Sequence, residues 1–170
     1  IKGSSGVSAT MIEGNFKMSA ASSSVGTKIT VEELFYNTPA RLKYLKLDYT
    51  ENAVTLDVLT KIALAHPQVS FSLYFDDKLR FKTNGRNDLK ETIMNIYGLT
   101  HVKNLLPINV STTDFKISGF LGNTNLVRAN RYGIITNLNG RNVYMPKVQS
   151  AIIEGYHGFI APSRFPFVII

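Results

Sequence analysis

Three consecutive residues, Asn139-Gly140-Arg141, combine a turn signal with a group that binds anions. An Asn-Gly pair favours a tight turn, and such a turn would hold the following arginine at a fixed place. The planar guanidinium of arginine suits the oxygens of a phosphate. The pattern therefore predicts a phosphate contact at Arg141; the structural alternative is that this side chain only solvates a loop. Other basic residues close in sequence could extend the surface, namely Arg128, Arg131 and Lys147.

The distribution of charge also indicates an anionic partner. The 170 residues hold 19 basic and 12 acidic side chains, a net charge of +7. Residues 115–170 hold six of the basic residues and a single acidic one, Glu154. A basic, acid-poor C-terminal third favours a polyanion as partner, although a solvated basic face would have the same composition. The charge of Lys61, on the polar side of an earlier helix, is expected to contribute much less to binding of a polyanion than the charge of Arg141.

Several classes of chemistry find no support in the residue types. The chain has no cysteine, which excludes disulfides and thiolate zinc sites. The three histidines, His66, His101 and His157, lack the spacing of metal ligands and are interpreted as structural. No phosphate-binding glycine loop, Gly-x-Ser-x-Gly motif or nucleophile with a base is present. We therefore predict no catalytic residue and no metal site. Neither a membrane span nor a signal peptide is apparent, so a cytoplasmic protein is the default.

The elements that position these residues follow from periodicity and caps. Alternating and helical patterns predict α/β architecture, a sandwich of mixed sheet and packed helices. The predicted strands cover 27–35, 69–75 with a return strand after Asp76-Asp77, 106–111, 115–122, 132–140 and 165–170. The predicted helices cover 38–46, 51–65, 88–97 and 146–156.

Local signals define the helix ends and the expected core. Thr38 and Pro39 predict one N-terminus, and the spacing of Asp88 and Glu91 predicts another, with Gly98 as the C-terminal cap. The second helix is expected to bury Val54, Val58, Leu59 and Ile62, and the common core to include Val54, Ile62, Phe71, Leu73, Ile93 and Ile152. Residues 1–24 are expected to form a mobile loop with a short strand pair near Gly14-Asn15. Both ends of the chain look cut, so a fragment of a longer protein is expected.

Two stretches resemble the MutL family of mismatch-repair ATPases. Residues 26–46, GTKITVEELFYNTPARLKYLK, are similar to the family's long signature, and 132–143, YGIITNLNGRNV, to its Asn-Gly-Arg strand and turn. The match between these anchors is collinear. The chain departs from the family at Asn137-Leu138, where an aromatic residue and Val are usual. A polar Asn137 in that strand leaves the register of the strand open.

The resemblance implies a domain division. Residues 1–35 would be the C-terminal remnant of a GHKL-type ATPase domain, and residues 36–170 a transducer and DNA-binding domain with the ribosomal protein S5 domain 2-like fold, truncated at its C-terminus. Gly26 and Thr27 would line the adenine side of the ATP site in the intact protein, although a simple turn would explain them too. The junction would be formed by Asn37, Pro39, Arg41 and Lys43, with Arg41 and Lys43 bracing it or facing DNA.

The resemblance also implies function. The intact protein would use ATP and Mg²⁺, form a homodimer, and couple a MutS-type mismatch-recognition protein to a downstream nuclease or helicase. The motifs for ATP chemistry lie outside this chain, so the fragment itself is expected to be inactive and to hold no cofactor. It would supply a surface that binds the DNA backbone without sequence preference, in a bacterial cytoplasm or a eukaryotic nucleus. The alternative is a free-standing S5-like module that binds RNA or DNA and has no ATPase.

Overall fold

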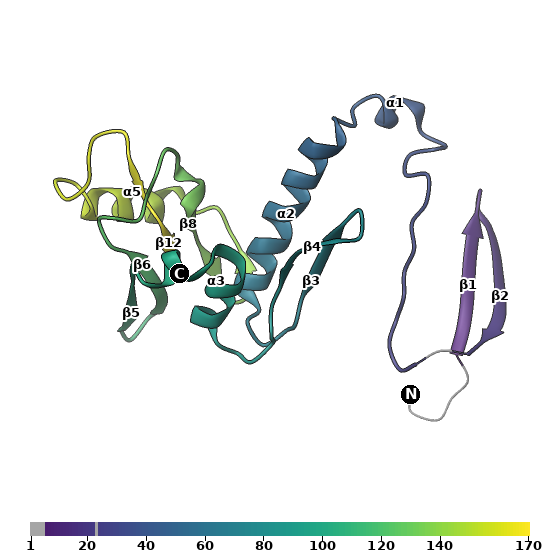
Figure 1. The fold of residues 1–170 in the computed structure, drawn as a ribbon, viewed down its shortest axis with the longest axis horizontal. Coiled ribbons are helices and arrows are strands. Elements are labelled where there is room, and N and C mark those ends of the chain that lie inside the picture. The colour runs from purple at the N-terminus through teal and green to yellow at the C-terminus, as the bar shows by residue number, and fades with distance from the viewer. Residues whose placement is uncertain (1–5, 23) are drawn as a thin grey trace. The chain divides into compact units, whose positions relative to one another are not determined.

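Residues 6–22 and 24–170 are described by a computed structural model of the chain (Figure 1). The backbone divides between Leu47 and Asp48 into two compact units. This division falls later than the domain boundary predicted after residue 35. The boundary between domains of a longer protein stays a prediction, because compactness within this chain does not test it.

The first unit contains a β-hairpin where a loop with only a short strand pair was expected. Strands β1 (Gly6–Ile12) and β2 (Asn15–Ala21) pair antiparallel along their whole length, from Gly6↔Ala21 to Ile12↔Asn15. The turn uses positive φ at Glu13 (50°) and Gly14 (80°), as a two-residue hairpin turn requires. The predicted pair at Gly14-Asn15 is thus confirmed and is longer than expected. Residues 1–5 and 23 of the expected loop lie outside the described residues, and its mobility stays a prediction.

The strand predicted at residues 27–35 is wrong. No regular strand forms there, and Ile29 and Val31 are 82% and 71% exposed. An alternating sequence becomes a strand only when another strand supplies the hydrogen-bonding ladder, and no described residue pairs with this segment.

The helix predicted at residues 38–46 shortens to α1 (Pro39–Leu42). Pro39 occupies the first turn as expected. Thr38 occupies the N-cap position, but its side chain makes no capping bond; its hydroxyl instead donates to the carbonyl oxygen of Phe35 at 3.5 Å. The prediction of Thr38 as a side-chain cap is therefore wrong.

The second unit follows the predicted order of elements closely. Its helices are α2 (Asp48–Ala65), α3 (Leu89–Tyr97), α4 (Leu99–Val102), the 3-10 turn η1 (Arg131–Gly133) and α5 (Pro146–Gly155). Its strands are β3 (Ser72–Phe75), β4 (Lys78–Lys82), β5 (Leu105–Ser111), β6 (Lys116–Gly122), β7 (Val127–Arg128), β8 (Ile134–Ile135), β9 (Asn137–Leu138), β10 (Arg141–Asn142), β11 (Phe165–Pro166) and β12 (Val168–Ile169). The predicted caps of α3 are present: the carboxylate of Asp88 accepts from the backbone N–H of Glu91 at 3.0 Å, and Gly98 has φ 85°.

The main sheet has the order β5-β6-β12-β8. Strand β12 runs antiparallel to β6 and parallel to β8, so the sheet is mixed, as predicted. The apolar C-terminal run reaches the interior because β12 has a neighbour on each side; Val168 and Ile169 are fully buried. The α/β class with helices packed on a mixed sheet is confirmed.

Two apolar clusters hold this unit together. One joins the sheet to α2 and α3 through Leu64, Ile93, Leu105, Leu126, Ile135, Phe167 and Ile169. The other joins α2 to the β3-β4 hairpin through Ala63, Leu73 and Phe81. The core prediction is confirmed at Leu73 and Ile93, and Phe71 and Ile152 are half-buried.

The predicted apolar stripe of α2 is largely wrong. Val54 is 52% exposed and Ile62 39%, and Val58 is also exposed, while Leu59 packs at the edge of the second cluster. Helix α2 is buried through Thr60, Ala63 and Leu64 near its C-terminal end instead. The face that a helix buries depends on what packs against it, and the two apolar clusters meet α2 near that end.

Candidate nucleic-acid interface

The Asn-Gly turn predicted from the sequence is present. Asn139 and Gly140 have φ of 49° and 77°, and they join β9 to β10 with Leu138 opposite Arg141. Two central residues with positive φ form the hairpin turn whose twist matches that of the flanking strands. Arg141 is exposed at the first position after the turn. The geometry therefore holds a solvent-facing guanidinium on a short, defined hairpin.

Asn137 satisfies its polar groups at the end of the main sheet. Its backbone N–H and its side-chain amide both donate to the carbonyl oxygen of Ile170, at 2.6 and 3.3 Å. Its Oδ1 accepts from Asn142 Nδ2 at 3.4 Å. The register is Asn137↔Asn142, which settles the question that the departure from the family pattern left open.

The structure brings Lys61 close to this hairpin, and the expectation that its charge contributes little to binding stays a prediction. Lys61 of α2 lines a cavity together with Asn142, the residue after Arg141. The C-terminal end of the same helix lies at the turn, since a Cβ added to Gly140 would lie 3.4 Å from the imidazole of His66. Contacts between α2 and β10 bring these residues together, and no pattern within a few residues of Lys61 could have shown it.

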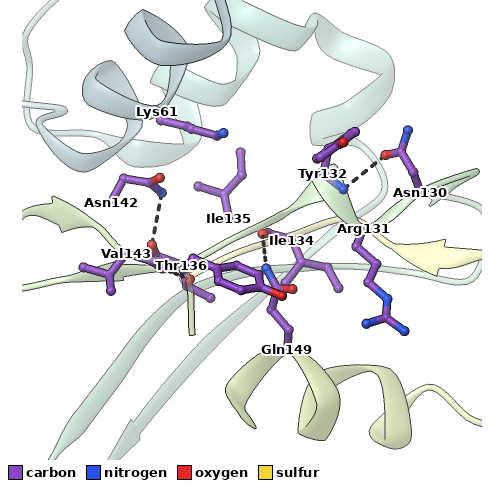
Figure 2. Close-up of a pocket in the computed structure, with 11 residues that line it drawn as sticks. Lys61, Asn130, Arg131, Tyr132, Ile134, Ile135, Thr136, Asn142, Val143 and Gln149 are labelled. Atoms are coloured by element: carbon purple, nitrogen blue, oxygen red, sulfur yellow. Dashed lines mark hydrogen bonds between the residues drawn. The ribbon is translucent and has the colours of Figure 1, made fainter. Parts of the chain in front are cut away.

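The cavity has a volume of about 540 Å³ (Figure 2). Its walls come from α2, the segment around η1, strands β8 and β10 with the residues after them, and α5. Polar and aromatic side chains dominate the lining, and none of the lining residues is acidic; they are Lys61, Asn130, Arg131, Tyr132, Ile134, Ile135, Thr136, Asn142, Val143, Tyr144 and Gln149.

Hydrogen bonds fix much of this lining. Asn142 Nδ2 donates to the carbonyl oxygen of Thr136 at 3.1 Å, and the Thr136 hydroxyl donates to the carbonyl oxygen of Val143. Gln149, which is only 7% exposed, donates from Nε2 to the carbonyl oxygen of Ile134 at 3.4 Å (Figure 2). Asn130 Oδ1 accepts from the backbone N–H of Tyr132 at 3.1 Å.

The other predicted basic residues lie in different environments. Arg131 is exposed, lines the cavity, and has its guanidinium 5.4 Å from the ring centre of Phe165. Lys147 is exposed in the first turn of α5. Of the predicted DNA-binding residues, only Arg131 lines the cavity, and Asn142 connects that cavity to Arg141 along β10.

Arg128 is half-buried, and its guanidinium contacts interior side chains. Its guanidinium lies 5.3 Å from the ring centre of Phe167, and its Nη2 donates to Nε2 of His101. Burial of the imidazole, and then the charge of Arg128, lower the pKa of His101 from its ordinary value. We therefore interpret Arg128 as a brace between β7 and α4 rather than as part of an exposed basic surface.

The cavity residues Asn130, Tyr132, Asn142, Tyr144 and Gln149 were missed from the sequence. One local signal was available: Tyr132 and Tyr144 stand at the two ends of the strand-turn-strand segment YGIITNLNGRNVY. The cavity residues that come from α2 and α5 are distant in sequence from this segment, and no local pattern indicated them.

The predicted residues of the first unit form no ligand site by themselves. Asn37, Pro39, Arg41 and Lys43 are exposed. Gly26 has φ 145° and nothing within 4 Å of the place where a Cβ would be, and Thr27 is exposed. By themselves, these exposed residues of the first unit do not enclose a site for ATP or Mg²⁺.

Within residues 6–22 and 24–170, no three His, Asp or Glu side chains gather as a metal site would require. No helix in the same ranges is long and apolar enough to span a membrane.

Comparisons with known proteins agree with this architecture. Residues 93–170 match the family model described as DNA mismatch repair protein, C-terminal domain. The chain is 46% identical to DNA mismatch repair protein MutL of Streptococcus uberis over 149 residues, which is 88% of the chain and 23% of that protein. It is also 46% identical to the MutL protein of Lactiplantibacillus plantarum over 145 residues, 85% of the chain and 21% of that protein. The chain thus spans less than a quarter of the length of these relatives.

A solved structure shows the same fold. The Aquifex aeolicus MutL ATPase domain complexed with ADP superposes with a TM-score of 0.73 at 19% identity, over 96% of this chain and 61% of that one. The resemblance of two sequence stretches to the family is thus supported by sequence identity along most of the chain and by the shared fold. The chain belongs to the MutL family of DNA mismatch repair proteins.

Proposed function

We propose that this chain is the part of a MutL-type mismatch repair protein that supplies a transducer domain and a surface for the DNA backbone. The observation that carries the proposal is the hairpin of β9 and β10, which presents Arg141 to solvent on a tight Asn-Gly turn. An exposed guanidinium held by the backbone suits a phosphate without reading a base. The excess of basic residues over 115–170 supports a polyanionic partner.

The intact protein, on this proposal, binds and hydrolyses ATP and works as a dimer between mismatch recognition and removal of the faulty strand. The ADP named for the Aquifex aeolicus relative supports nucleotide binding by the longer protein. A MutS-type protein, a downstream nuclease or helicase, and DNA are the proposed partners. The relatives are bacterial, which favours the cytoplasm as its location.

The test is a salt titration of DNA binding by the 170-residue chain and by Arg141→Glu. Nonspecific binding by one isolated domain should sit near the weak end of about 10⁻⁴–10⁻⁶ M. The substitution removes one attractive charge and adds a repulsive one, so it should weaken binding to every sequence about equally. Loss of one phosphate contact should also reduce the slope of log affinity against log salt by about 0.9 on duplex DNA.

The matched control is Lys116→Glu. Lys116 lies in the same basic segment and is exposed, but it stands at the β5-β6 turn, beyond the part of β6 that pairs with β12. Lys116→Glu therefore makes the same change of charge as Arg141→Glu, but at a place away from the β9-β10 turn. Equal losses from both variants would show that binding follows net charge alone, and the Asn-Gly-Arg turn would lose its proposed role.

A further inference from the structure

The cavity behind the β9-β10 hairpin carries two cationic groups beside free polar atoms. Lys61 and Arg131 both line it. Lys61 Nζ lies 2.6 Å from Asp57 Oδ2, and the Lys61 side chain is 28% exposed while that of Asp57 is 54% exposed. Asp57 itself is not part of the lining. A lysine paired with an exposed carboxylate can turn to a stronger anion, because such surface pairs contribute little stability.

Three amides of the lining each have one atom held and the other available. Asn142 and Gln149 donate through their nitrogens to backbone carbonyls, and Asn130 accepts through its oxygen from a backbone N–H. Asn142 Oδ1, Gln149 Oε1 and Asn130 Nδ2 have no hydrogen-bond partner in the described part of the chain. The held atom fixes the orientation of each amide, so the cavity offers two acceptors and one donor in set places.

Two tyrosine rings at this cavity are largely exposed. Tyr132 is 80% exposed and Tyr144 70%, and neither ring is packed against another aromatic ring of the described residues. A ring with free faces next to cationic groups is the arrangement that single-stranded nucleic acids use for stacking their bases.

We propose that this cavity is a subsite for one unpaired nucleotide of a DNA single strand. The phosphate lies by Lys61, the base stacks on Tyr132 or Tyr144, and one amide oxygen, that of Asn142 or of Gln149, accepts from its polar edge. A volume of about 540 Å³ lies within the range of about 300–1,000 Å³ for small-ligand sites. This inference rests on the proposed DNA-binding function of the same unit.

The position of Asn142 connects the subsite with the backbone contact. Arg141 and Asn142 are adjacent on β10, so their side chains point to opposite faces of the strand. A strand whose phosphate contacts Arg141 must therefore turn around the edge of the β9-β10 hairpin to reach the cavity, which Asn142 lines and Arg141 does not. A paired base lies inside the duplex stack and cannot enter, which makes the cavity selective for unpaired DNA.

The test compares two fluorescent oligonucleotides of equal length and charge, oligo(dT) and the same backbone with abasic sites. The 170-residue chain should bind oligo(dT) on the order of tenfold more tightly, since one base stacked on an aromatic ring contributes about 1–3 kcal/mol. Tyr132→Ala combined with Tyr144→Ala should abolish this preference and leave binding of the abasic strand unchanged. The same change to Phe at both positions should keep the preference, because stacking needs the ring and not the hydroxyl.

Tyr74→Ala is the matched control, because Tyr74 is a 56% exposed tyrosine on β3 and lies outside the cavity lining. Asp57→Asn should strengthen binding of both oligonucleotides by freeing Lys61, and Lys61→Gln should weaken both. Photocrosslinking of an iodouracil-substituted strand should label the peptides that contain Tyr132 or Tyr144.

Three results would overturn the subsite. They are equal affinity of the wild type for oligo(dT) and the abasic strand, a preference that survives loss of both tyrosines, and competition by thymidine monophosphate as strong as by oligo(dT). Arg141→Glu separates this inference from the proposed function. This substitution should weaken binding of both oligonucleotides equally, whereas loss of the nucleotide subsite removes only the preference for oligo(dT). A failure of the backbone contact and a failure of the subsite therefore give different results.

Discussion

At the residue scale, Gly119 shows how closely β6 approaches β12. Its φ is 149°, and a Cβ at this position would lie 2.1 Å from the backbone oxygen of Ile169. A backbone atom of a buried strand cannot move aside as the end of a flexible side chain can. Glycine is therefore required here by the approach of another backbone as well as by its own conformation.

We expect Gly119→Ala to lower the free energy of unfolding by about 3 kcal/mol or more, because it must separate β6 from the central strand. Gly155→Ala is the control, since Gly155 lies in α5 with nothing within 4 Å of an added Cβ. It should be neutral or stabilise by up to about 1 kcal/mol through helix propensity. Urea unfolding of both variants measures the difference, and equal stability would contradict the close approach.

His101 predicts a dependence of stability on pH. Its ring lies 5.3 Å from that of Tyr97 and 5.5 Å from that of Phe167. Burial and the Arg128 charge lower its pKa in the folded state. As the pH falls below about 6.5, the ordinary value for histidine, the unfolded chain binds a proton that the folded chain still refuses. This contribution to stability is therefore lost as the pH falls and is constant above that value.

We expect the free energy of unfolding to decrease from pH 7.5 towards pH 5.5 in the wild type, and to decrease less in His101→Gln. Urea midpoints across this range give the slope, which is the informative quantity because the substitution also removes the contact with Arg128. Identical slopes in the wild type and in His101→Gln would mean that the environment of His101 has no effect on its titration.

At the element scale, α3 depends on its first-turn cap. The helix has nine residues, too few to be stable in water alone, so the bond from the backbone N–H of Glu91 to Asp88 and the packing of Ile93 support it. Glu91 does not complete a reciprocal cap, because its Oε1 accepts from Asn84 Nδ2 at 2.7 Å.

Asp88→Ala should destabilise the fold by about 1 kcal/mol, within the usual range of about 0.5–2 for a lost N-cap. Asp88→Asn should retain most of the stability, because its side-chain oxygen can still accept the bond. Asp114→Ala, at an exposed site in the β5-β6 turn, is the control and should change little. Denaturant unfolding of the three variants makes the comparison; an Asn variant as unstable as the Ala variant would exclude capping as the cause.

At the scale of the whole chain, the two units differ in how they are stabilised. Every buried apolar side chain in the described residues lies at position 63 or later. The first unit exposes large apolar side chains, among them Met11 at 70% and Ile29 at 82%. Its hairpin has backbone pairing but no core, and isolated hairpins are marginal in water.

We therefore expect residues 48–170 alone to unfold at the same urea midpoint as residues 1–170. In the full chain, amides of residues 6–22 should exchange with solvent much faster than those of β6 and β12. Exchange measured by mass spectrometry after proteolysis resolves the two regions. A midpoint that falls on removal of residues 1–47, or strong protection across 6–22, would show that the first unit contributes to stability.

The sequence by itself determined the features that depend on a few neighbouring residues. The turn at Asn139-Gly140, the cap at Asp88 and the strands β5 and β6 were predicted at their places, because turn, cap and strand signals lie within a few neighbouring residues. The two family stretches likewise identified the family before any contact was known.

Only the tertiary structure decided which of these features meet. The alternating residues at 27–35 lack a strand partner among the described residues, α2 buries a different face from the one its apolar spacing predicted, and the half-buried Arg128 contacts His101 and Phe167. Lys61 reaches the cavity beside Asn142 because α2 packs on β10. Pairing of strands and packing of faces join residues that are distant in sequence, so the residue types at each position do not specify their partners.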